Sequence, residues 1–465
     1  MNWETNEDEN DDLQLQKFES MLKTNKVFFF DSEEFEDIIF HYLDNGKLNL
    51  AKKALKLALD QHPNSFGLKL VQVEVYLFED KLDIAEKLVD QLYTIQPTNE
   101  DIFLLKATIC SRKHFHEKAI ENLKIGLKYT DDPAEFYSLL GMEYLFLDNL
   151  EEAKNSFILC LENDPEDHSA LYNIVYCFDF LDQNNESIEF LNSYIDKNPY
   201  SDVAWHHLGK EYYYTKQYEK SVWAYNYAID IDETFTGAYF EKGKSLEKLK
   251  KYDEALACYK TTLTLDDPSG YAYFRMGKCY NKQKDYENAL KYFNKAIYED
   301  PLLDKAWIAI TKFYTKQKNY EKALFYLNSA LEIDNENSKY WAIFAQVNIQ
   351  LSFFEEAEFG FRKSFECGNL KFNNFILWAD TLNLLGEISL GLEVLTQAAE
   401  VYENEYEFDY RLAGFHFLNN NNEKGLEFLE KALKIDAKKH KIIHDYFPQI
   451  FEMPIIQKLI NKYIK

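Results

Sequence analysis

The sequence predicts an all-α solenoid built from tandem antiparallel helix pairs. The first observation is a column of small side chains that recurs every 34 residues without insertion or deletion. The second is a column of bulky apolar side chains four residues further on. A fixed period in this range is typical of stacked supersecondary units that share one continuous core. The small column consists of Ala51, Ala85, Ala119, Ala153, Ser187, Ser221, Ala255, Ala289, Ala323, Ala357, Gly391 and Gly425.

Each repeat is expected to contain two helices. With Ser32 as position 1, the repeats begin at residues 32, 66, 100, 134, 168, 202, 236, 270, 304, 338, 372 and 406. Apolar residues at positions 4, 7, 8 and 11, and again at 20, 24 and 27, follow the spacing of one helix face. Small residues at 8 and 20 would let the two helices approach closely. Proline, which lacks an N–H group, predicts the end of the second helix at Pro63, Pro97, Pro165, Pro199 and Pro301.

These columns resemble the tetratricopeptide repeat. One repeat carries Tyr273, Met276, Gly277, Tyr280, Ala289, Phe293, Ala296 and Pro301. Another carries Trp205, Leu208, Gly209, Tyr212, Ser221, Tyr225 and Ala228. The resemblance covers residues 32 to about 439 and implies a right-handed superhelix of twelve hairpins. It also implies a concave side lined by positions 2, 5, 9 and 12 of the first helices, where such proteins hold peptides.

Two segments flank the predicted repeat array of residues 32–439. Residues 1–31 form an acidic segment, of which 1–12 are expected to be disordered. Residues 13–30 are expected to be partly helical, with Val27 and the following Phe run packing on the first repeat. Residues 440–465 end in an apolar stripe opposite lysines. This stripe predicts either a helix that caps the last repeat or a basic amphipathic helix for a membrane surface or a partner, and we favour the cap.

Composition limits the possible partners and locations. The net charge of −27 argues against nucleic acid as the main partner, because phosphate binding depends on accumulated Lys and Arg. No apolar run reaches the length of a membrane span. The six cysteines form no Cys-x-x-Cys pair and are expected to be buried, reduced thiols. We therefore expect a cytoplasmic protein.

No motif in the sequence points to catalysis. Phosphate-binding glycine loops, zinc-protease motifs and nucleophile elbows are all missing from it. His440 and His444 lie four residues apart and could share a helix face, but surface histidines are the favoured interpretation. We therefore expect no enzyme activity, no cofactor and no metal.

The predicted binding residues lie on the first helices. Position 9 is lysine in four successive repeats, flanked by aromatic and basic residues, and earlier repeats carry tyrosines on the same face. The four lysines are Lys210, Lys244, Lys278 and Lys312, and the neighbours are Tyr172, Tyr176, Tyr213, Phe240, Phe274, Arg275 and Lys305. One interpretation is a strip that binds an acidic peptide; the other is that lysine here is an ordinary solvated, helix-favouring residue.

The resemblance implies a scaffold or adaptor for protein or peptide partners. The family's carboxylate clamp needs Lys at position 5 and Asn at position 9, and no repeat has Lys at position 5. Chaperone docking of that type is therefore not expected. Two alternatives stay open: a structural or self-associating component of a larger complex, and a regulatory protein that binds a small ligand.

Overall fold

The structure is a computed structural model that describes residues 14–23, 28–402 and 405–464. These residues contain helices and no strands, which confirms the predicted all-α class. The first helix of every repeat begins at the residue predicted as position 1. The helices are α2 (Ser32–Asp44), α3 (Leu48–Gln61), α4 (Phe66–Phe78), α5 (Leu82–Ile95), α6 (Glu100–Arg112), α7 (His116–Gly126), α8 (Ala134–Phe146), α9 (Leu150–Asn163), α10 (His168–Phe180), α11 (Asn184–Lys197), α12 (Asp202–Tyr214), α13 (Tyr218–Ile231), α14 (Thr236–Lys248), α15 (Tyr252–Leu265), α16 (Gly270–Lys282), α17 (Tyr286–Glu299), α18 (Asp304–Lys316), α19 (Tyr320–Ile333), α20 (Ser338–Gln350), α21 (Phe354–Glu366), α22 (Phe372–Leu385), α23 (Ile388–Val401), α24 (Tyr406–Leu418), α25 (Asn422–Asp436), α26 (Lys441–Tyr446), α27 (Pro448–Phe451) and α28 (Pro454–Ile464), with a short 3₁₀ helix, η1, at Ala437–Lys439.

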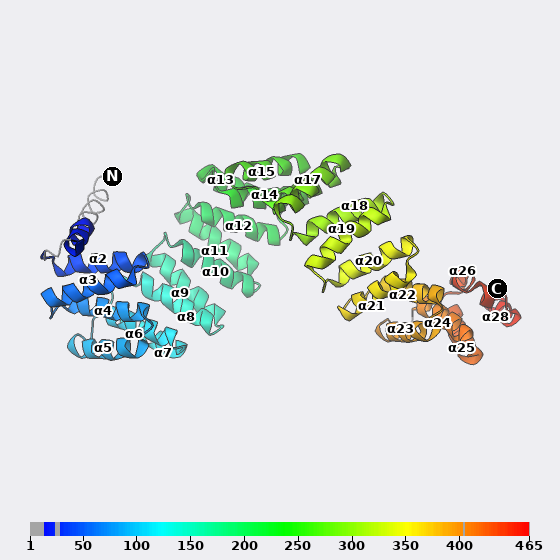
Figure 1. Cartoon of the computed structure of the whole chain (residues 1–465), viewed down its shortest axis with the longest axis horizontal. Helices are drawn as coiled ribbons and strands as arrows, with labels where there is room; N and C mark the ends of the chain where they lie inside the picture. The colour runs from blue at the N-terminus through cyan, green and yellow to red at the C-terminus, as the bar shows by residue number, and fades with distance from the viewer. Residues whose placement is uncertain (1–13, 24–27, 403–404, 465) are drawn as a thin grey trace. The chain divides into compact units, whose positions relative to one another are not determined.

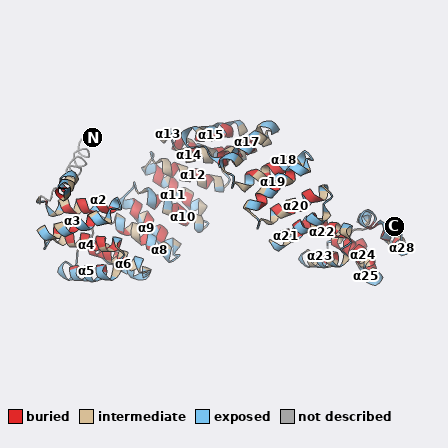
Figure 2. Ribbon diagram, viewed as in Figure 1, coloured by how far each residue is buried: buried red, intermediate tan, exposed pale blue. Residues whose placement is uncertain are grey.

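The chain forms two compact units, Met1–Glu233 and Thr234–Lys465. The first contains α2 to α13, and the second contains α14 to α28. Within each unit, the first helix of a repeat packs on the second, and the second packs on the first helix of the next repeat (Figure 1). Buried residues recur along every pair, as Figure 2 shows. Each unit is thus a solenoid of tandem helix pairs.

Close packing between the two helices of a repeat depends on a missing side chain at position 8. A Cβ atom added to Gly141, Gly209, Gly243 or Gly277 would lie 2.5–2.7 Å from the aromatic ring at position 24 of the same repeat. These rings belong to Phe157, Tyr225, Tyr259 and Phe293. The small residue at position 20 is fully buried beside them, as at Ala255 and Ala289. The columns therefore record helix packing, as the sequence predicted.

The turn between the two helices places position 15 in the left-handed region. This column has φ between 54° and 76° in all twelve repeats, although only two of its members, Gly46 and Gly386, are glycine. In the repeat of α14, Lys250 (φ 61°) donates its N–H to the carbonyl of Glu247, and Lys251 donates to Leu246. This is the hydrogen-bond pattern that closes many helix C-termini. The sequence gives little sign of it, because Asp, His, Lys, Ser and Asn fill most of the column.

The proline column ends the second helices as expected. Helices α3, α5, α9, α11 and α17 each stop two residues before their proline. The missing N–H and the fixed φ of proline explain this shared end point.

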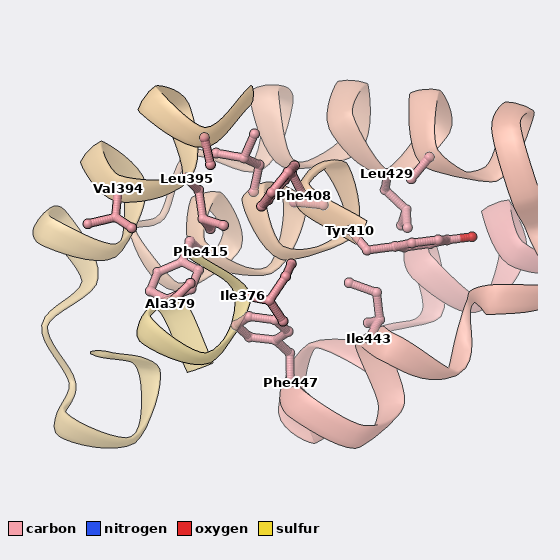
Figure 3. Close-up of a cluster of buried hydrophobic side chains, with 14 of the residues drawn as sticks. Ile376, Ala379, Val394, Leu395, Phe408, Tyr410, Phe415, Leu429, Ile443 and Phe447 are labelled. Carbon is pink, nitrogen blue, oxygen red and sulfur yellow. The ribbon is translucent and has the colours of Figure 1, made fainter. Parts of the chain in front are cut away.

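The C-terminal region packs on the last repeat. In the cluster of Figure 3, Ile443 and Phe447 join Phe415 of α24, and the Phe415 and Phe447 rings lie 5.6 Å apart. Phe447 fits against the bare Cα of Gly414, where an added Cβ would come within 2.5 Å of the ring. Along α28, Ile456 is buried, whereas Ile455 is 53% exposed. The apolar stripe is thus divided between core and surface, and its role as a cap stays a prediction.

At the N-terminal end, residues 14–23 are helical. Phe18 and Phe30 are fully buried against Phe35 and Tyr42 of the first repeat. Phe29 is 64% exposed, so only part of the Phe run packs inward. The expected disorder of residues 1–12 and the expected packing of Val27 lie outside the described residues.

The packing column makes a first prediction. Ala289→Leu should destabilise the α16–α17 hairpin by about 1–3 kcal/mol, because the added atoms have no space beside Phe293. Lys291→Leu, at an exposed position of the same helix, is the matched control. Hydrogen exchange of the α16 and α17 amides measures the local effect. Equal protection in the two variants would contradict the packing interpretation.

The turn column makes a second prediction. Gly386→Ala should destabilise the α22–α23 hairpin by about 1–2 kcal/mol. No heavy atom lies within 4 Å of the added Cβ, so the cost is one of backbone conformation alone. Lys250→Gly should have little effect, since relief of the left-handed strain offsets the flexibility of glycine. Thermal unfolding of both variants tests the pair, and a stable Gly386→Ala protein would exclude this constraint.

Candidate functional site

The first helices of the second unit line an open hollow of about 640 Å³. It brings together four of the residues predicted from the sequence, Phe274, Lys278, Lys305 and Lys312. They come from α16 and α18, and α20 closes the far side. The other lining residues are Asn281, Phe293, Ile308, Ala309, Thr315, Lys316, Tyr340, Ile343 and Gln346.

Two further hollows, of about 510 and 680 Å³, adjoin the first. All three share Ile343 and Gln346, and Lys312 belongs to two of them. Together they form one groove from α16 to α22, which we call the lysine groove. Its remaining lining residues are Tyr320, Lys339, Ala342, Val347, Ile349, Gln350, Asn369, Lys371, Phe372, Asn373, Asn374, Ile376, Leu377 and Tyr402.

The charge of the groove is opposite to that of the chain. None of the residues that line it, all within the fully described stretch 270–402, is Asp or Glu. Five of its six lysines form no ion pair with any described residue: Lys305, Lys312, Lys316, Lys339 and Lys371. An anion could therefore bind these ammonium groups without first breaking an existing ion pair.

Lys278 is the sixth lysine and is only weakly paired. Its Nζ lies 3.7 Å from a carboxylate oxygen of Glu247. Burial and the neighbouring Arg275 lower the pKa of Lys278, against the effect of Glu247. An anionic ligand would supply the charge compensation that this ammonium group lacks.

A simple rule explains which position 9 lysines are paired within a unit. Position 9 meets position 12 of the preceding repeat, 31 residues earlier. Lys210 pairs with Asp179 at 2.8 Å in this way, and Lys278 approaches Glu247. For Lys312 the corresponding residue is Asn281, and both line the groove. The lysine column is thus regular in sequence but not in its pairing.

Two predicted residues are held in ion pairs beside the groove. The Arg275 Nε lies 2.8 Å from Glu247, which also accepts a hydrogen bond from the Tyr259 hydroxyl at 2.8 Å. Lys244 pairs with Glu241 at 2.6 Å. Phe240 packs its ring against Tyr259 and Tyr271. None of Arg275, Lys244 and Phe240 lines the hollows of the groove.

The remaining predicted residues belong to the first unit. Tyr172 is 59% exposed, the Tyr176 ring contacts Phe180 at 4.5 Å, and the Tyr213 ring contacts Tyr218 at 5.6 Å. These tyrosines and Lys210 do not line the hollows of the lysine groove, whose lining residues all belong to the second unit.

Sequence reasoning missed three groove lysines. Lys339 occupies position 2, like Lys305, and reading that position one repeat further would have found it. Lys316 lies at position 13, one residue beyond the positions considered. Lys371 lies in the connection before α22, where the repeat pattern gives no signal.

The first helices of the N-terminal repeats carry carboxylates at comparable positions. Glu36, Glu74, Asp101 and Glu135 occupy positions 5, 9, 2 and 2 of the first four repeats. Burial raises the pKa of each, and repulsion from neighbouring acids raises it further. This part of the first unit therefore disfavours an acidic ligand.

Family comparisons agree with the helix-pair geometry. Family models described as tetratricopeptide repeat match residues 134–167, 236–268, 270–301 and 304–337. The chain is a tetratricopeptide repeat protein. Such proteins are typically non-enzymatic scaffolds for protein interaction, and this general role is the one that the family supports.

Solved structures also resemble this tetratricopeptide repeat protein. The crystal structure of MamA is 21% identical, with a TM-score of 0.32, and the match covers 35% of this chain and 95% of MamA. The C-terminal part of a repeat-containing protein from Cytophaga hutchinsonii is 16% identical, with a TM-score of 0.44, over 51% of this chain and 98% of that one. No curated protein sequence matches the chain. Among the described residues, no helix combines the length and apolarity that crossing a membrane requires.

Beside Lys210, the buried Glu211 makes a third prediction. Burial raises the pKa of Glu211 from 4.5 to about 7, although Asn184 donates a hydrogen bond to it at 3.1 Å. The folded state therefore holds this proton more tightly than the unfolded state, and the free energy of unfolding falls as pH rises from about 4.5 to about 7. Glu211→Gln should accordingly raise the melting temperature more at pH 8 than at pH 5.

The matched control is Glu219→Gln, on the exposed side of α13. The pKa of the buried His207 is lowered to about 3, which changes stability with pH in the opposite sense. Comparing variant with parent protein at each pH removes that contribution. An equal shift at both pH values would show that the charge of Glu211 does not change between them, which would contradict the raised pKa.

Proposed function

We propose that the lysine groove binds an acidic segment of a partner protein, so that the chain serves as a scaffold or adaptor in the cytoplasm. The observation that carries this proposal is the group of five unpaired lysines around one groove without a carboxylate, in a chain of net charge −27. Because no acidic residue lines the groove, this local excess of positive charge favours an external anion.

The surface between the lysines supports a peptide rather than a small ion. Phe274, Ile308 and Tyr340 are each less than 10% exposed and line the first hollow. Apolar groups of this kind supply contact area for side chains, while the lysines supply attraction and register. The three hollows continue over four repeats, which suits an extended segment better than a compact ligand.

A fourth prediction tests this function with a defined ligand. A labelled peptide that alternates glutamate and leucine should bind the full chain, and a peptide that alternates lysine and leucine should not. Substituting Lys305, Lys312 and Lys316 together by Gln should weaken binding of the acidic peptide roughly tenfold, because each exposed charge pair contributes about 0.2–1 kcal/mol. Fluorescence anisotropy at several salt concentrations measures the affinity and its electrostatic part.

The matched control substitutes Lys260, Lys291 and Lys322 by Gln, on the second helices α15, α17 and α19. It changes the net charge equally and leaves the groove intact. The same loss of affinity in both triple variants would mean that overall charge, not the groove, attracts the peptide. Absence of binding to the parent protein would overturn the proposed function.

A further inference from the structure

The hollow at the start of α22 differs from the rest of the lysine groove in its polarity. Its volume is about 510 Å³, and three lysines line it: Lys312 of α18, Lys339 of α20 and Lys371, the residue before α22. Three asparagines, Asn369, Asn373 and Asn374, line it as well. Positive charge and hydrogen-bond donors from three helix regions thus converge on one small volume.

The backbone that carries two of these lysines is fixed by buried hydrogen bonds. The Asn369 side-chain amide donates to the carbonyl of Ser338 at 3.2 Å and to the Ser364 hydroxyl at 3.0 Å. The Ser364 hydroxyl also donates to the Ser338 carbonyl, at 2.7 Å. Ser338 directly precedes Lys339, and Asn369 lies two residues before Lys371. The start of α20 and the connection into α22 are therefore locked together, which holds both lysines at the hollow.

The N-terminus of α22 faces the same place. This helix has 14 residues, and its first residue, Phe372, donates its N–H to the Tyr402 hydroxyl at 3.1 Å. Tyr402 in turn donates to the carbonyl of Leu370 at 2.8 Å. The N-cap residue is Lys371, which provides no side-chain acceptor for the helix. A helix start with a cation as its cap favours a bound anion.

Asn374 also lines the hollow and is only 9% exposed, and its amide Nδ2 makes no hydrogen bond within the described structure. This nitrogen is itself buried, so it does not reach a group that lies in the hollow. The positive charge of the hollow therefore comes from Lys312, Lys339 and Lys371 and from the start of α22.

We propose that this hollow binds the phosphate group of a phosphoserine or phosphothreonine on the partner segment. A phosphate carries nearly two negative charges and three terminal oxygens, which match three lysines and a helix N-terminus. A carboxylate would bring one charge and two oxygens. This proposal rests on the proposed function. A phosphorylated residue can place its phosphate in this hollow only if the rest of the partner segment lies in the adjoining hollows.

The test uses the full chain and three peptides of one acidic sequence, with serine, phosphoserine or glutamate at a central position. The phosphoserine peptide should bind roughly tenfold more tightly than the serine peptide, with the glutamate peptide between them. In parallel, inorganic phosphate should raise the melting temperature relative to chloride at matched ionic strength.

Two variants assign the preference to this hollow. Lys371→Gln and Lys339→Gln, both at exposed positions, should fold normally and each reduce the phosphoserine preference, and the double variant should abolish it. Neither should change affinity for the serine peptide as much as substitution of Lys305 and Lys316. Lys363→Gln on α21, outside the groove, is the control.

Each outcome decides the proposal. Equal affinity for the phosphoserine and serine peptides would overturn it, and an effect of inorganic phosphate alone would then assign the hollow to free phosphate. A preference that survives both variants would also overturn it. If no peptide binds but inorganic phosphate stabilises the parent chain and not the Lys339 and Lys371 variants, the acidic-segment function fails while the phosphate-binding hollow stands.

Discussion

The contact between the aromatic ring at position 24 and the bare Cα at position 8 sets the geometry on which the rest depends. Tyr259 on Gly243 and Phe293 on Gly277 bring the two helices of a repeat closer than any larger residue would permit. Since each hairpin has nearly the same internal geometry, successive first helices present the same positions to the same side within a unit. This regularity brings Lys278, Lys312 and Lys339, on three different helices, to one groove.

Whether a lysine on a first helix forms an ion pair depends on the neighbouring repeat. A lysine on a first helix is neutralised when the preceding repeat offers a carboxylate 31 residues earlier, as Asp179 does for Lys210. Replacing that acid by an amide leaves the lysine available, as Asn281 does for Lys312. An unpaired, solvated ammonium group has little cost for stability, so the fold tolerates a cluster of them. The consequence is a local positive potential in a strongly acidic chain.

The helices and their packing could be predicted from the sequence because each column reports a contact inside one repeat. Ala289, Phe293 and Pro301 each predict local structure by residue type alone. Their contacts lie within one repeat of 34 residues, and the same residue types recur in the other repeats. The left-handed turn was missed because residues such as Lys250 and Asp148 accept a conformation that only Gly46 and Gly386 signal. Two features depend on side-chain directions between repeats, which no single column records. They are the pairing of Arg275 with Glu247 and the lack of a hydrogen-bond acceptor for the Asn374 amide.

Similarity among the repeats does not make their surfaces equivalent. Glu36 and Glu74 lie at positions 5 and 9, where the repeats of the second unit place Phe274 and Lys278. Burial and repulsion from Asp101 raise the pKa of both carboxyl groups, although Arg112 partly offsets this at Glu74, so their face is destabilised further by added negative charge. The proposed acidic segment would therefore be disfavoured in the N-terminal repeats and favoured between α16 and α22. Selection among the repeats follows from the sign of charge at a few positions, while the packing columns that build every repeat stay the same.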